Sequence, residues 1–113
     1  MKVQSNIWRV NLVNELIKNI EQWSIDRGLD KGNKDKQALK FYEEAGEVAA
    51  AILRNDMHEL KDGIGDSVVT LIILAQQYGT DIETCLQQAY DEIKGRKGRL
   101  VDGTYIKEAD LNE

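Results

Sequence analysis

A chain of 113 residues, with 42% hydrophobic and 31% charged residues, has the composition of one soluble globular domain and not of a disordered segment. Its formal net charge of −5 gives no broad positive field, so neither a nucleic-acid polymer nor a membrane is an expected partner. Cys85 is the only cysteine, which excludes an intrachain disulfide and favours a small buried side chain. Because the N-terminus also lacks a signal-peptide core, we expect a reducing, cytoplasmic location.

The first two predicted helices follow from hydrophobic spacing and local stop signals. Apolar residues recur at helical spacing over about residues 6–27, and Gly28 then accepts the left-handed conformation that closes a helix. After a polar loop, Asp35 is the expected N-cap of a second helix over about residues 35–54. Trp23, near the end of the first helix, is expected to pack in the core or to form one wall of a base pocket by stacking.

Capping-box patterns mark the starts of the third and fourth helices. Asp56 stands three residues before Glu59, which predicts a helix over about residues 56–78. A similar pattern at Thr80 opens a helix over about residues 81–97. The third helix is apolar nearly all round, and three neighbours in so small a chain scarcely enclose it. We therefore expect a homodimer or a homotetramer.

The C-terminal part of the chain predicts a β-hairpin. Residues 99–107 alternate around Asp102-Gly103, a strong local hairpin signal, and the polar tail that follows is expected to fray. The predicted elements belong to one domain over residues 1–113. Its expected class is all-α: an antiparallel four-helix bundle with a short C-terminal β-hairpin.

Acidic side chains gather on the second and third helices. Glu44 and Glu47 are spaced to share one helix face, and so are Asp62 and Asp66. Carboxylates in apolar surroundings are costly to keep ionised unless a cation compensates them. An all-carboxylate set without a cluster of histidines or cysteines suits Mg²⁺, with Mn²⁺ as an alternative, and argues against zinc. Gly46 lies among small residues, which favours close helix contact there.

Simpler explanations in helix chemistry compete with the metal hypothesis. Glu43 can be solvated or paired with Lys40 or Lys36, and Glu59 is accounted for by its capping position. Asp66 lies too far inside its helix to cap it and precedes an almost wholly apolar run. It is therefore the acid for which a functional role is most strongly indicated.

Basic residues close the fourth predicted helix: Lys94, Arg96, Lys97 and Arg99. Cations at that end complement the helix dipole. They are also suited to bind phosphate, and arginine can do so through two parallel hydrogen bonds. The two roles are compatible.

The acidic motifs resemble those of the MazG-like branch of the all-α nucleoside triphosphate pyrophosphohydrolases, and its small phage and Firmicute members in particular. Glu43-Glu44-Ala45-Gly46-Glu47 fits the family motif Glu-Glu-x-x-Glu in full, and Asp66 fits the aspartate of the family motif Glu-x-x-Asp. Two positions depart from the family pattern. Gly63 stands where the second motif has its glutamate, and Gly95 stands where the last helix often has an asparagine. Asp62 shares a helix face with Asp66 and is placed to take over the glutamate's role.

The resemblance implies hydrolysis of an NTP or dNTP to its monophosphate and pyrophosphate. A water molecule, oriented by Glu43 or Glu47, would attack the α-phosphorus in line. The implied catalytic residues are Glu43, Glu44, Glu47 and Asp66. The implied Mg²⁺ ligands are Glu44, Glu47, Asp62 and Asp66. The implied substrate contacts are Trp23, Lys40, Thr70, Lys94, Arg96 and Lys97.

Two other classes of function are open on the sequence. A catalytically weak nucleotide-binding or regulatory module of the same fold is motivated by Gly63 and Gly95, and it would show no turnover. A helical interaction protein with incidental acids would gain no stability from Mg²⁺ and nucleotide. A di-iron carboxylate bundle is disfavoured, because the Glu-x-x-His pairs that such sites use are absent from the sequence.

Overall fold

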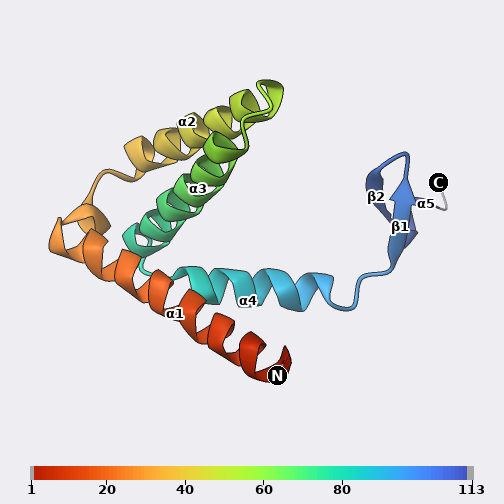
Figure 1. The fold of residues 1–113 in the computed structure, drawn as a ribbon, viewed down its shortest axis with the longest axis horizontal. Helices are drawn as coiled ribbons and strands as arrows, with labels where there is room; N and C mark the ends of the chain where they lie inside the picture. The colour runs from red at the N-terminus through yellow and green to blue at the C-terminus, as the bar shows by residue number, and fades with distance from the viewer. Residues whose placement is uncertain (1, 112–113) are drawn as a thin grey trace. The chain divides into compact units, whose positions relative to one another are not determined.

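The chain folds into helices and one short hairpin, arranged in two units (Figure 1). The computed structural model describes the backbone of residues 2–111 and the side chains of residues 12–111. The unit over residues 1–82 contains α1 (Lys2–Asp26), the 3-10 helix η1 (Leu29–Lys31), α2 (Lys34–Leu53) and α3 (Met57–Gln77). The unit over residues 83–113 contains most of α4 (Ile82–Ile93), then β1 (Gly98–Val101), β2 (Thr104–Lys107) and α5 (Glu108–Leu111). The all-α class with a short C-terminal hairpin is confirmed.

The helix boundaries follow local chain chemistry. Gly28 ends α1 with a positive φ of 72°, as predicted, and Gly79 follows α3 with a φ of 75°. Asp56 caps α3, because its carboxylate accepts a hydrogen bond from the backbone N–H of Glu59 at 3.0 Å.

The N-cap of α2 differs from the prediction. The Asn33 side chain accepts a hydrogen bond from the backbone N–H of Lys36 at 2.9 Å, so Asn33 is the cap and the assignment to Asp35 was wrong. Asp35 lies inside the first turn, where its charge faces the positive end of the helix dipole.

α2 and α3 form an antiparallel helix pair joined by a short loop (Figure 1). Gly63 is buried where the helices meet, and a Cβ built on it would lie 3.0 Å from Cγ2 of Val48. A Cβ on Gly46 would have no neighbouring atom within 4 Å. The close contact predicted at Gly46 was therefore wrong, and it is the missing side chain of Gly63 that lets the two helices approach.

The core of the first unit lies mainly along α3. The buried hydrophobic residues among the described side chains are Ala51, Ile72, Ile73 and Ala75. Two glutamine amides of α3 hold the neighbouring segments: Gln76 Nε2 donates to the carbonyl of Glu21 at 3.2 Å, and Gln77 Nε2 donates to the carbonyl of Leu29 at 2.9 Å. The last turns of α3 thus bind both α1 and η1.

Large apolar side chains stay exposed on α1 and α3. Leu16 of α1 is 51% exposed, and Ile64 and Val68 of α3 are 51% and 44% exposed. Burying such a side chain stabilises a fold by roughly 1.5–3 kcal/mol. These exposed side chains do not contribute that stabilisation within the chain. No helix in the described part of the chain is both long and apolar enough to cross a membrane.

The hairpin of the second unit matches the prediction closely. β1 and β2 pair antiparallel from Gly98 opposite Lys107 to Val101 opposite Thr104. Asp102 and Gly103 form the turn with positive φ angles of 50° and 80°, as an Asp-Gly hairpin turn requires.

Three features of the second unit correct the predictions. α4 ends at Ile93, before the basic residues that were expected to form its last turn. Residues 108–111 of the polar tail, which was predicted to fray, form the short helix α5 directly after β2, and residues 112–113 lie outside the described residues. Cys85 is exposed, so the expectation of a buried thiol was wrong.

Candidate functional site

The packing of α2 on α3 brings two of the predicted site residues together. The helices run antiparallel and meet where Val48 contacts Gly63. In an antiparallel pair, the residue one turn before Val48 faces the residue one turn after Gly63. These residues are Glu44 and Asp66, one from each acidic motif.

The carboxyl of Asp66 is electrostatically coupled to its acidic neighbours. Its pKa is raised above the ordinary value, first by loss of water around the carboxyl and then by the negative charges of Asp62 and Glu44. A hydrogen bond with Asp62 raises the pKa further, whereas the charge of Lys40 lowers it. Glu44, Asp62 and Asp66 therefore form one acidic cluster.

Lys40 supplies a positive charge beside this acidic cluster. Its Nζ lies 3.4 Å from Oε1 of Glu43 and 3.4 Å from Oε1 of Glu44. Of the alternatives for Glu43, the structure thus shows the pairing with Lys40. The second pair, with Glu44, could have been found from the i,i+4 spacing. The charge of Glu43 is the largest cause that raises the pKa of Lys40.

The acids differ in how far they reach into solvent. The Glu44 side chain is only 14% exposed, whereas the Glu43 side chain is 62% exposed. Glu47, Asp62 and Asp66 are also exposed, although Asp66 was expected in apolar surroundings. Glu47 is not among the groups that perturb Asp66. The structure thus places Glu44, Asp62 and Asp66 within electrostatic reach of one another. Glu43 is linked to Glu44 only through their shared ion pair with Lys40.

The donor chemistry of the acidic cluster fits a hard divalent cation. The potential ligands are all carboxylate oxygens. Loss of water around Asp66 and the charges of Asp62 and Glu44 raise the pKa of Asp66, and a bound cation would offset both effects. As the side chains lie, no three acidic, histidine or cysteine residues of the described chain converge closely enough to bind a metal ion. Binding would therefore need rotation of side chains, with Glu44 leaving its ion pair with Lys40.

Thr70 lies one turn beyond Asp66 and is buried. It is 5% exposed, and its Oγ1 donates to the carbonyl of Ser67 at 2.7 Å. Its own carbonyl accepts a hydrogen bond from Gln37 Nε2 of α2 at 3.0 Å. Gln37 links α2 to α3 next to the acidic cluster, and nothing in its sequence context marks it for that role.

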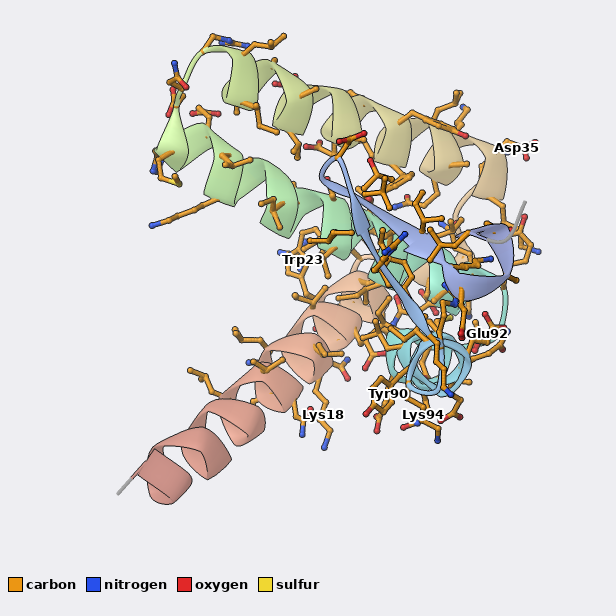
Figure 2. All side chains as sticks on the ribbon, turned by 90° about the vertical axis from the view of Figure 1, so that its right-hand side faces the viewer. Lys18, Trp23, Asp35, Tyr90, Glu92 and Lys94 are labelled. Carbon is orange, nitrogen blue, oxygen red and sulfur yellow. The ribbon has the colours of Figure 1, made fainter. Side chains whose placement is uncertain are left out.

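Trp23 borders an apolar groove on the first unit. It is 43% exposed, and Figure 2 shows it toward the end of α1. The groove has a volume of about 350 Å³ and is lined by Leu16, Asn19, Ile20, Trp23 and Val69. The Arg27 guanidinium lies 4.6 Å from the centroid of the Trp23 ring, a cation–π contact.

The basic residues of the second unit follow the end of α4. Lys94, Arg96 and Lys97 are all exposed in the segment that leads into β1. Lys94 forms an ion pair with Asp91 at 3.0 Å and lies 6.0 Å from the ring centroid of Tyr90, beside it in Figure 2.

Comparison with known proteins assigns the family. The model of the MazG nucleotide pyrophosphohydrolase domain matches residues 34–101, more than half of the chain, including both acidic motifs. The chain belongs to the MazG family. The expected family resemblance is therefore confirmed.

One relative of this MazG domain comes from a bacteriophage. Over 68 residues the chain is 44% identical to an uncharacterized 18.2 kDa protein in the rep-hol intergenic region of Haemophilus phage HP1. The match covers 59% of this chain and 42% of the relative, so the chain spans less than half of the phage protein's length. No solved structure matches the chain significantly.

Proposed function

We propose that this MazG domain is a Mg²⁺-dependent nucleoside triphosphate pyrophosphohydrolase, which converts an NTP or dNTP and water to the monophosphate and pyrophosphate. The coupling of Glu44, Asp62 and Asp66 across the α2–α3 pair supports the proposal most directly. Neighbouring carboxylates that repel one another at a family motif would be stabilised by a bound divalent cation.

The residues proposed to hold Mg²⁺ are Glu44, Glu47, Asp62 and Asp66, with Mn²⁺ as an alternative ion. The bound ion would neutralise charge on the substrate phosphates. Glu43 or Glu47 would orient a water molecule and accept its proton. The water oxygen would bond to the α-phosphorus while the bond to the bridging α–β oxygen breaks, and pyrophosphate would leave with that oxygen.

Substrate contacts are proposed for an exposed aromatic ring and for exposed cations. The exposed ring of Trp23, at the edge of an apolar groove, is suited to stack on a base. The exposed cations Lys40, Lys94, Arg96 and Lys97 are suited to phosphate oxygens. Thr70 would act by holding the backbone beside Asp66, because its hydroxyl is already bonded to Ser67.

The activity is tested by measuring pyrophosphate release from a panel of NTPs and dNTPs with Mg²⁺. We expect turnover with at least one nucleotide, and its loss on chelation with EDTA. Absence of turnover at high protein concentration would reject the enzyme. If Mg²⁺ and nucleotide then still raise the melting temperature, the chain is a nucleotide-binding or regulatory module.

We also propose that the protein is a homodimer or homotetramer in the cytoplasm. The exposed side chains of Leu16, Ile64 and Val68 supply apolar surface for a second copy. Light scattering after size-exclusion chromatography tests the assembly. The Val68→Asp variant should shift the mass toward the monomer, whereas a monomeric wild-type protein would reject the proposal.

A further inference from the structure

We infer that Lys40 is a counter-cation that pairs with Glu44 of the acidic cluster in the metal-free protein, leaves Glu44 when a divalent cation binds, and thereby sets the affinity for that cation. The inference rests on the proposed function, since it assumes that the acidic cluster binds a metal. It adds a role for Lys40 that precedes any contact with substrate.

The position of the Lys40 ammonium supports this role. It lies at the same distance, 3.4 Å, from one carboxylate oxygen of Glu43 and one of Glu44. Both distances exceed the usual length of a charge-assisted hydrogen bond, so the ammonium is shared between the two acids and bound tightly by neither. A cation held in this way can be exchanged for another.

The difference in burial makes Glu44 the residue that needs a cation. Its side chain is 14% exposed, so it has little water to stabilise its charge when unpaired. The Lys40 side chain is 51% exposed, and its long flexible stem can turn the ammonium into solvent. The exchange therefore moves the ammonium into solvent, and the largely buried Glu44 carboxylate can then turn toward the incoming cation.

The ion pair between Lys40 and Glu44 has to break before Glu44 can converge with the other acids on one ion. With Glu44 turned toward Lys40, no three acidic side chains in the described residues are close enough to bind a metal ion. A divalent ion brings two charges where Lys40 brings one. It can therefore replace the ammonium, which is then free to contact a phosphate oxygen.

The experiment measures Mn²⁺ binding to the nucleotide-free full chain from the electron paramagnetic resonance signal of free Mn²⁺. Lys40→Met removes the charge and keeps a good helix former. Lys40→Arg keeps the charge. Lys36→Met is the matched control, because Lys36 lies one turn earlier on α2 and forms no ion pair with the described residues.

We expect Lys40→Met to lower the dissociation constant for Mn²⁺ about fivefold, as removal of a competing partially exposed cation should. Lys36→Met should change it less than about twofold, and Lys40→Arg should resemble the wild type. Unchanged or weaker binding by Lys40→Met, with the wild type still binding Mn²⁺, would overturn the inference alone. Absence of Mn²⁺ binding in every variant would overturn the proposed metal site as well.

A second measurement follows Lys40 directly. In wild-type protein, the NMR signal of the Lys40 side chain should shift when Mg²⁺ is added, and the Lys36 signal should not. A Lys40 signal that stays in place while Mg²⁺ binds would show that the ammonium is not displaced.

Discussion

A Cβ built on Gly63 would lie 3.0 Å from Cγ2 of Val48, across the contact between α2 and α3. Gly63 stands where the family motif has a glutamate, and in this chain the position serves helix packing. The carboxylate that interacts with Asp66 comes instead from Asp62, one residue earlier. Compared with the family motif, the acid thus stands one position earlier, at Asp62, and the glycine at position 63 allows a close helix contact.

The matched pair Gly63→Ala and Gly65→Ala tests this packing role. Both changes gain helix propensity, but a Cβ on Gly65 meets no atom within 4 Å, whereas a Cβ on Gly63 would press on Val48. We expect Gly65→Ala to raise the free energy of unfolding by about 0.5–1 kcal/mol and Gly63→Ala to lower it by about 1 kcal/mol. Urea unfolding measures both, and equal effects would contradict the packing role.

Asp66→Asn is expected to lower the turnover number at least about 100-fold, since it removes a proposed metal ligand. The helical circular dichroism spectrum should be unchanged, because Asp66 is exposed and the amide is similar in shape. Glu59→Gln is the matched control in the same helix, because the backbone N–H of Glu59, and not its carboxylate, donates the capping hydrogen bond to Asp56. Near-normal turnover of Asp66→Asn would remove this residue from the mechanism.

The raised pKa of Asp66 predicts a pH-dependent cost to stability. Between the ordinary pKa of 3.8 and the raised one, the folded protein binds more protons than the unfolded chain, so stability falls as pH rises through this window. Without metal, Asp66→Asn should therefore melt above the wild type at pH 7, and the difference should shrink below pH 3.8. Melting curves in EDTA test this. A difference independent of pH would exclude the carboxyl as its source.

The corrected cap of α2 also makes a prediction. Asn33→Ala removes the side chain that accepts from the backbone N–H of Lys36 and should lower the free energy of unfolding by about 1 kcal/mol. Asp35→Ala removes only a favourable charge near the positive end of the helix dipole and should lower the free energy of unfolding by about 0.3–0.5 kcal/mol. Thermal unfolding of the two variants compares them, and a larger loss for Asp35→Ala would favour the original assignment.

Several local features of the chain were predictable because neighbouring residues decide their conformation. Gly28 ends a helix, Asp56 caps one, and Asp102-Gly103 turns a hairpin, because positive φ and side-chain capping depend on a few consecutive residues. The exposure of Cys85 was not predictable in the same way, since burial depends on what another element places over the thiol.

The acidic site combines both kinds of information. The sequence by itself determined the helices, the faces on which the acids lie and the hard-oxygen chemistry that suits Mg²⁺, because helical periodicity arises from hydrogen bonds between near neighbours. Tertiary structure decided that Glu44 lies near Asp66, whereas the i,i+4 spacing within α2 already places Lys40 beside Glu44. The register of two helices depends on the side-chain volumes where they touch, and here the missing side chain of Gly63 lets Val48 approach.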